Sequence, residues 1–400
     1  MERTASDKAL YLKKISDRML IVFRTVGMWP DTESSIFYSI YGILLLAIFS
    51  IAFTSTMMIQ LICFTKKEEL TETSYMALTE LALSVKIINF FLRVRSMQSH
   101  LITGNQFKLY SAAEHEHFVK RLKFVFKLLM ADFLLTNIAH LSVQIKTIMA
   151  SERMLAFPAW HPIEWENDAQ NYWLIFAYQV IGMTITSNIQ VVIQQYPSLM
   201  FFLVSIQMEI LSMRLRNNGY DESRTSDSTK LTKEDKTIKI FSNEEERRIS
   251  NTMKDCVNVH YKILKFAKQL ERDFTIPFFV QICISGIVIC SLANEAARTN
   301  DPVKQISFGT ILLTMSFQIY FPCYFGNEVM ATSNNLSTEM YKSNWIHFNA
   351  KQKQMVSMFI EGTKKNKYIL IGNLFVLSLQ TFSSILNVAY RLLAVIKNTA

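Results

Sequence analysis

Long stretches without any charged side chain dominate the chain. Asp, Glu, Lys and Arg are absent from five runs of 21 to 40 residues, which are Ser34–Thr65, Ala169–Met208, Phe274–Asn294, Gln305–Asn327 and Tyr368–Tyr390. A helix rises about 1.5 Å per residue, so each run is long enough to cross a hydrocarbon core of about 30 Å. Buried helices of soluble proteins rarely extend so far without a charge. The pattern therefore predicts five membrane-spanning helices.

Two further apolar segments contain a few charges. The segments are Tyr75–Leu92 and Phe124–Met149, and their charged residues are Glu80, Lys86, Lys127, Asp132 and Lys146. Polar side chains of a membrane bundle face its interior, so we predict that both segments are spans. The predicted fold class is all-α, with seven transmembrane helices. The run of 40 residues is about twice as long as a bilayer requires, so we expect the fourth helix to bend at Pro197 and to continue into the cytoplasm.

Basic residues are distributed unequally between the two sides of such a bundle. The side that holds the N-terminus carries 32 Lys and Arg residues, and the opposite side carries 7. Without the long loop between the fourth and fifth spans, the ratio is 18 to 7. Cytoplasmic loops carry the excess of basic residues, so we predict a cytoplasmic N-terminus and an extracellular C-terminus. Contact with anionic membrane lipid then accounts for the net charge of +9, and no nucleic-acid partner is expected.

The composition argues against several other classes of protein. The 400 residues are 50% hydrophobic with only 10 Gly, which is not typical of a disordered or secreted protein. The five Cys form no CxxC pair, so we expect neither a metal site nor a disulfide framework. No glycine-rich phosphate loop or GxSxG motif occurs, and we interpret His115-Glu116-His117 as a solvated loop. We therefore expect no enzyme activity and no cofactor.

The polar segments between the spans predict how the chain is organised. We expect a cytoplasmic N-terminus at 1–33, spans 1–4 at 34–214, a flexible cytoplasmic loop at 215–243, a cytoplasmic helix at 244–273, spans 5 and 6 at 274–327, a cytoplasmic anchor helix at 328–367, and span 7 with an extracellular C-terminus at 368–400. Apolar residues at helical spacing indicate both cytoplasmic helices, after Glu244 in the first and between Leu336 and Ile360 in the second. We expect these helices to pack together and against neighbouring subunits. Helices that lie on the membrane surface are the alternative.

Several sequence motifs are more specific than the helical pattern. They are FPCYFGNE at Phe321–Glu328, Tyr341 and Trp345 in MYKSNW, NLFVLSLQTFSSILNVAYRLL at Asn373–Leu393, FPAWHP at Phe157–Pro162, Gln179, and His260, Leu264 and Phe266 before the fifth span. Together these motifs resemble those of insect odorant receptors. The resemblance extends across most of the chain and is most specific in the C-terminal block. The chain lacks the large second cytoplasmic loop of the shared co-receptor, so it resembles a ligand-tuning subunit. One departure is Arg391, which follows Tyr390 where a Ser is common.

The resemblance implies an odorant-gated, non-selective cation channel in the plasma membrane of an olfactory neuron's dendrite. Such a channel is a hetero-oligomer, a tetramer with the co-receptor around one central pore. The resemblance also implies that the seventh span lines the pore and that the cytoplasmic parts of spans 4 to 7 form a subunit anchor, to which His260, Tyr341 and Trp345 belong. The outer halves of spans 2, 3, 4 and 6 are then expected to enclose a small volatile ligand.

Eleven residues in those outer halves are candidates for ligand binding. They are Tyr75, Thr79, Leu83, His140, Gln144, Phe176, Val180, Met183, Phe308, Ile311 and Met315. Asp132, Thr136, His140 and Gln144 form a polar stripe on the third span, for which a structural hydrogen-bond network is the alternative. For the others, the alternative is lipid contact or helix packing. Volatile ligands offer few polar groups, so recognition is expected to rest on apolar contacts worth about 25 cal/mol per Å².

Leu393, Ile396 and Lys397 lie on one helical face at the end of the seventh span. The resemblance favours a pore in which Leu393 is an apolar constriction that gates by dewetting and Lys397 lies at the mouth. An ordinary packed helix end is the alternative. Two other classes are disfavoured: the sequence has no Asp/Glu-Arg-Tyr run or NPxxY ending of a G-protein-coupled receptor. It also shows no paired broken helices of a transporter, because Pro197 alone interrupts a predicted span visibly.

Overall fold

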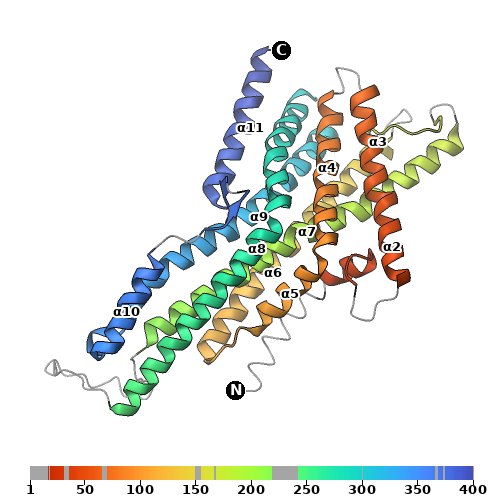
Figure 1. Cartoon of the computed structure of the whole chain (residues 1–400). Helices are drawn as coiled ribbons and strands as arrows, with labels where there is room; N and C mark the ends of the chain where they lie inside the picture. The colour runs from red at the N-terminus through yellow and green to blue at the C-terminus, as the bar shows by residue number, and fades with distance from the viewer. Residues whose placement is uncertain are drawn as a thin grey trace.

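The structure, a computed structural model, describes residue 17 and residues 19–30, 36–64, 70–148, 155–165, 168–218, 242–299, 301–364, 368–372 and 374–399. The side chains of residues 70–72, 105, 146, 303–304, 393 and 396–399 lie outside this description. Most described residues are helical, and the long helices run side by side as an elongated bundle (Figure 1).

The order of elements follows the predicted spans. A short helix through residues 19–25 precedes one continuous helix made of α2 (Ile36–Leu46), the π-helical turn η1 (Ala47–Ala52), α3 (Phe53–Ile59) and the π-helical turn η2 (Gln60–Phe64). The remaining elements are α4 (Leu70–Leu92), α5 (Val94–Gln106), α6 (Ala112–Ile148), α7 (Ala169–Asn217), α8 (Asn243–Arg298), α9 (Pro302–Tyr341), the 3₁₀ turn η4 (Trp345–His347), α10 (Ala350–Thr363), β1 (Leu370–Ile371), β2 (Phe375–Val376) and α11 (Leu379–Thr399).

The predicted seven-helix, all-α membrane fold is confirmed. Within the described residues, 6 helices are long and apolar enough to cross a membrane, and α11 adds a seventh long helix of 21 residues. The two spans that contain charges are among them, as α4 and α6. A chain with this composition and these helices is a multi-pass membrane protein.

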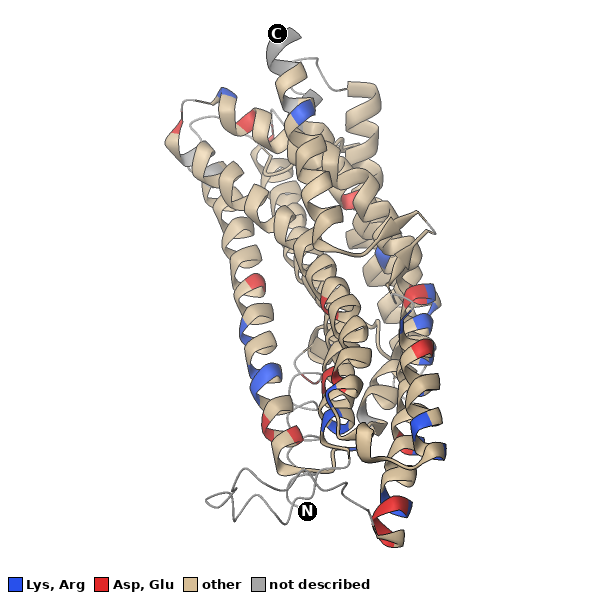
Figure 2. Cartoon of the chain, turned by 90° about the vertical axis from the view of Figure 1, so that its left-hand side faces the viewer, with Lys and Arg blue, Asp and Glu red and all other residues tan. Residues whose placement is uncertain are grey.

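Charged side chains gather at one end of the bundle (Figure 2). This charged end comprises residues 93–123, 209–217, 243–273 and 328–364, and the middle of the bundle is almost free of charge. The last turns of α11 lie at the far end (Figure 1). The separation of charge along the helices is the structural counterpart of the uncharged runs in the sequence.

Helix α7 is the centre of the bundle. Every residue from Ile189 to Met208 is buried, and α7 contacts α4, α5, α6, α8 and α9. A helix covered on all sides needs no polar face, which explains why the longest uncharged run of the chain forms it. The helix continues through Pro197, which lies inside it.

Within the described residues, proline lies inside three spans, so the prediction that Pro197 alone interrupts a span was wrong. Besides Pro197, Pro277 lies inside α8 and Pro322 lies inside α9. A proline cannot donate to the carbonyl one turn earlier, so that carbonyl needs another partner. For Pro277 the carbonyl is that of Asp273, and Asn89 Nδ2 on α4 donates to it over 3.2 Å. The interruption of α8 is therefore compensated by a contact between helices.

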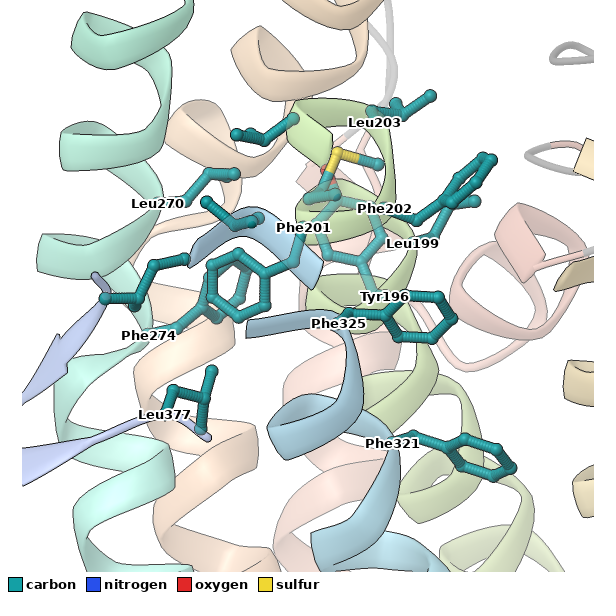
Figure 3. Packing of buried hydrophobic residues seen from close by; sticks show 14 of the residues in the cluster. Tyr196, Leu199, Phe201, Phe202, Leu203, Leu270, Phe274, Phe321, Phe325 and Leu377 are labelled. Atoms are coloured by element: carbon teal, nitrogen blue, oxygen red, sulfur yellow. The ribbon is translucent and has the colours of Figure 1, made fainter. Parts of the chain in front are cut away.

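Aromatic side chains fill the core where these helices meet (Figure 3). Tyr196 is almost fully buried, and its hydroxyl donates to the Met97 carbonyl over 2.6 Å. Its ring packs against the rings of Phe23, Trp29, Phe90 and Phe274. The hydroxyl thus has a partner, as a buried polar group requires, while the ring contributes apolar contact on every side.

One buried carboxylate ties α5 to α8 at the charged end. Asp273 accepts hydrogen bonds from Arg93 (2.7 Å) and Ser96 (2.5 Å), and His100 Nε2 lies 3.0 Å from its second oxygen. Burial lowers the pKa of His100 below its ordinary value, although the neighbouring Asp273 opposes this effect. The imidazole is therefore neutral in the fold, with Nε2 donating to the carboxylate.

A second ionic cluster joins three helices nearby. Arg121 on α6 donates to Glu209 on α7 over 2.8 Å and to Glu328 on α9 over 2.6 Å. His117 also contacts Glu209, at 2.6 Å, so the prediction of a solvated loop at His115-Glu116-His117 was wrong: these residues belong to α6. Glu328 is the last residue of the FPCYFGNE motif, so the motif's acid has a structural role at the charged end. The cluster fixes α6, α7 and α9 relative to one another.

The uncharged run Tyr368–Tyr390 is not one helix, contrary to the sequence-based prediction. Its first part forms an antiparallel hairpin in which Leu370 pairs with Val376, and helix α11 begins only at Leu379. The chain turns at Gly372, whose φ of 61° is a left-handed conformation that suits glycine. The seventh span therefore starts later than predicted and extends to Thr399.

The predicted anchor helix at 328–367 is also divided. Helix α9 runs on to Tyr341, η4 follows, and α10 begins at Ala350. Asn349 is the N-cap of α10. Its side chain accepts from the backbone N–H of Gln352 (2.9 Å), and the side chain of Gln352 accepts from the backbone N–H of Asn349 (3.2 Å). This capping box starts a new helix where the apolar spacing alone suggested a continuous one.

Candidate functional site

A cavity of about 100 Å³ lies between α4, α6, α7 and α9, in the half of the bundle away from the charged end. Its walls are mainly apolar with a few polar groups, which is typical of small-molecule sites. The lining residues are Tyr75, Met76, Thr79, Glu80, Thr136, Ala139, His140, Val143, Phe157, Met183, Ser187, Gln190, Ile311, Thr314, Met315 and Gln318.

One wall of the cavity comes from the loop between α6 and α7. Gln179 on α7 is fully buried and forms a two-point pair with Phe157 of this loop: its amide nitrogen donates to the Phe157 carbonyl (3.0 Å), and its oxygen accepts from the Phe157 amide (3.2 Å). The Phe157 ring thereby lies stacked on His140, with ring centres 6.3 Å apart. The pair holds an aromatic ring of the loop against the cavity.

A second contact of Gln179 continues this arrangement. Its amide nitrogen lies 3.2 Å from Nε2 of His161, and burial lowers the pKa of His161. A neutral His161 can accept the hydrogen bond from Gln179. The FPAWHP motif at Phe157–Pro162 and Gln179 thus form one hydrogen-bonded unit, which explains why these residue types occur together.

Most polar side chains around the cavity already have protein partners. Thr79 donates to the Tyr75 carbonyl (2.6 Å), and Thr314 donates to the Thr310 carbonyl (2.9 Å). Gln190 donates to the Gln318 side chain over 3.0 Å, which links α7 to α9. Nε2 of His140 lies 2.8 Å from Gln144 and 3.2 Å from Thr184. These groups are therefore already hydrogen-bonded, either within their own helix or, for Gln190 and His140, also to a neighbouring helix.

Glu80 on α4 is different. Its side chain is buried and lines the cavity, and its Oε2 atom has no hydrogen-bond partner in the protein. Its backbone carbonyl accepts from Thr54 over 3.4 Å, so the backbone oxygen has a partner while Oε2 of the carboxyl has none. An unpaired polar atom in an apolar environment costs about 1–3 kcal/mol, so this position calls for an explanation.

The structure brings six of the eleven predicted ligand-binding residues together. Those that line the cavity are Tyr75, Thr79, His140, Met183, Ile311 and Met315. Phe308 and Phe176 are buried in the same apolar cluster without lining the cavity, and Val180 packs against that cluster. Gln144 does not line the cavity, but its side chain lies 2.8 Å from His140, which does. Leu83 lies in the main core of the bundle instead.

Ten lining residues were not among the predicted ones. They are Met76, Glu80, Thr136, Ala139, Val143, Phe157, Ser187, Gln190, Thr314 and Gln318. Three of them had a signal in the sequence: Glu80 is a charge within a span, Thr136 belongs to the polar stripe of the third span, and Phe157 belongs to FPAWHP. The other seven are ordinary residues of membrane helices, and only the packing of the helices identifies them.

The predicted gate and anchor residues occupy distinct parts of the fold. Leu393, Ile396 and Lys397 belong to α11, and their side chains are outside the described residues. His260 on α8 is buried and packs edge to face on Phe359 of α10. Tyr341 at the end of α9 is 67% exposed and stacks obliquely with Trp345, which is partly exposed.

Comparisons with known proteins agree with this fold. The sequence model of the family described as 7tm Odorant receptor matches residues 66–390. Odorant receptor 94a of Drosophila melanogaster is 25% identical over 96% of each chain, and Odorant receptor Or1 of Anopheles gambiae is 24% identical over 95% of this chain and 94% of its own.

Solved structures show the same architecture. The olfactory receptor OR5 of Machilis hrabei covers 98% of this chain and 99% of its own with a TM-score of 0.84 at 14% identity. Its complex with eugenol covers 98% and 100%, with a TM-score of 0.82. Because the family model matches most of the chain, this protein is a member of the insect odorant receptor family.

Proposed function

We propose that this chain is the ligand-tuning subunit of an odorant-gated, non-selective cation channel. The cavity between α4, α6, α7 and α9 is the observation that carries the proposal, since it is apolar, small and walled by a loop held in place through Gln179. Such a site suits a small volatile molecule, whose binding rests on apolar contact. A relative of the same fold was solved in complex with eugenol, which supports a ligand site in this fold.

The proposed channel has its N-terminus in the cytoplasm and its C-terminus outside, in the dendritic plasma membrane of an olfactory neuron. The charged end of the bundle, which carries most of the Lys and Arg residues, then faces the cytoplasm. In this orientation the cavity lies in the outer half of the membrane, where a ligand from the external fluid reaches it. In this proposal, each loop and helix outside the membrane lies on the side that the sequence predicts for it.

Two surfaces of the single chain support assembly with a co-receptor into a tetramer. On α11, Gln380, Ser384, Asn387 and Arg391 form one exposed polar stripe, and a polar stripe on a membrane helix requires protein or water beside it. At the charged end, the large apolar side chains of Tyr341, Ile346 and Met358 are exposed. Exposed apolar groups of this size are typical of subunit contacts, in agreement with an anchor that includes Tyr341 and Trp345.

The test is to express the chain with the co-receptor and record from excised membrane patches. We expect odorants to evoke a cation current within milliseconds, without GTP or a G protein, and patches with the co-receptor alone serve as the control. A response that disappears in excised patches and depends on a G protein would contradict the channel and favour a metabotropic receptor. In the same cells, an epitope placed after Ala400 should be accessible without permeabilisation, and its inaccessibility would contradict the orientation.

A further inference from the structure

Glu80 has three features, and among the described residues that line the cavity only Glu80 has all three. It is an acid, its side chain is 3% exposed, and its Oε2 atom has no partner in the protein. A carboxyl oxygen turned into an apolar cavity without a donor is costly, so a stable bundle alone does not require it. The position is explained if the missing donor arrives with the ligand.

Neighbouring side chains of the protein do not supply that donor. Lys86 lies on the same helix six residues further on, and its Nζ donates to Gln194 over 3.0 Å. None of the ion pairs between described residues joins Lys86 to Glu80. The nearby amide of Gln190 donates to Gln318, and the hydroxyl of Thr79 donates to its own helix. Each of these donors is committed elsewhere.

We propose that Glu80 receives the polar head of the ligand, and that the cavity selects small, largely apolar molecules with one hydrogen-bond-donating head group, a hydroxyl or an amine. The inference rests on the proposed function, in which this cavity is the odorant site. A carboxyl oxygen accepts hydrogen bonds whether the group is ionised or protonated, so a donor head matches Glu80 in both states. Rings and methionines such as Phe157, Met183 and Met315 hold the apolar body.

Four compounds with one carbon skeleton test the class of ligand. Benzyl alcohol and benzylamine carry a donor, benzaldehyde carries only an acceptor, and toluene has no polar head. The readout is the ligand-induced rise in the unfolding temperature of the purified full chain, which reports binding without any channel activity. We expect the two donor compounds to bind about tenfold or more tightly than benzaldehyde and toluene, because a hydrogen bond to a buried carboxyl discriminates to about that extent.

Variants of Glu80 then assign the effect to this residue. Glu80→Met removes the acceptor and should abolish the preference for donors while toluene still binds. Glu80→Gln keeps an acceptor oxygen but has no ionisable group. It should therefore weaken the binding of benzylamine more than the binding of benzyl alcohol, which distinguishes an amine head from a hydroxyl head. Asp132→Asn is the matched control: Asp132 is also buried with one unpartnered oxygen, Oδ1, yet it does not line the cavity. It should leave the ranking of the compounds unchanged.

Equal binding of all four compounds to the unaltered chain would overturn the inference, even if no variant folds. Persistence of the donor preference in Glu80→Met would overturn it as well, and so would a loss of the preference in Asp132→Asn equal to that in Glu80→Met. These outcomes differ from failure of the proposed function. A chain that binds donors through Glu80 but passes no current with the co-receptor would contradict the channel alone.

Discussion

Gly326 is the position where a single methyl group should disturb the junction between α9 and the start of α11. It lies in the FPCYFGNE motif, and a Cβ added there would lie 2.5 Å from the carbonyl oxygen of Leu377 and 2.8 Å from its Cγ. Leu377 is buried, and its amide donates to the Ile369 carbonyl over 2.9 Å, so its backbone is held by the hairpin. We therefore predict that Gly326→Ala is destabilising.

The magnitude follows from two opposing effects. Overpacking against a fixed backbone costs about 1–3 kcal/mol, while alanine stabilises a helix interior by about 1 kcal/mol relative to glycine. Gly309 on the same helix provides the matched control, because an added Cβ there meets no atom within 4 Å. Gly309→Ala should show the helix effect alone. The difference between the variants then isolates the clash with Leu377, at about 1–3 kcal/mol.

The assay is thermal unfolding of the two purified variants in the same detergent. For a chain of 400 residues this difference in free energy corresponds to an unfolding temperature about 1–4 °C lower for Gly326→Ala than for Gly309→Ala. Equal unfolding temperatures would show that the hairpin yields to the methyl group. The close approach of α9 to Leu377 would then not be a rigid contact, contrary to our prediction.

Two other predictions concern the charged end and the proposed gate. His100 is held neutral by burial, so below its ordinary pKa of about 6.5 the unfolded chain gains a proton first. The unfolding temperature should fall as the pH decreases through that range, and less so in His100→Gln; an identical pH dependence in the variant would contradict this. Leu393→Ala should raise the resting current of cells that also express the co-receptor, whereas Val395→Ala, two residues away, should not. An equal rise in both would remove Leu393 from the gate.

The sequence predicted the spans well because a membrane imposes a strong constraint on composition. Charged residues are excluded from the interior of a bilayer unless they face the bundle, so uncharged runs such as Ala169–Met208 mark helices directly. The start of α8 was also predicted, since apolar residues recur at helical spacing after Glu244, and the structure adds a capping box between Ser242 and Glu245. Both signals act within one segment and need no knowledge of its neighbours.

The hairpin before α11 shows where composition stops being informative. An uncharged run such as Tyr368–Tyr390 satisfies the rule for a span, but the rule does not distinguish a helix in lipid from a strand covered by protein. Here Ile369 and Ile371 are buried against the bundle, so the hairpin needs no charges. The sequence signal for the turn was a single glycine, Gly372. Because glycine also occurs within helices, this residue alone did not indicate a hairpin.

The cavity could be predicted only in part, because its depth depends on contacts between helices. Tyr75, Thr79 and Leu83 form one stripe on α4, and helical spacing treats them alike. In the structure the first two line the cavity, whereas Leu83 packs in the main core. The hydrogen bond between Gln190 and Gln318 joins the facing helices, and these two residues are the last ones along α7 and α9 that line the cavity. The sequence of one helix alone therefore does not predict how deep the cavity extends.

The buried ionisable residues of α4 connect stability with selectivity. A bundle that only had to be stable would gain from apolar residues at Glu80 and Lys86, since burying an unpaired charge is costly. Lys86 joins the amide network through Gln194, so its cost is offset by a contact between α4 and α7. Glu80 has no such compensation within the described residues, and it lines the cavity. Local rules of packing are broken at functional positions more than elsewhere, which supports the proposal that Glu80 receives the polar head of the ligand.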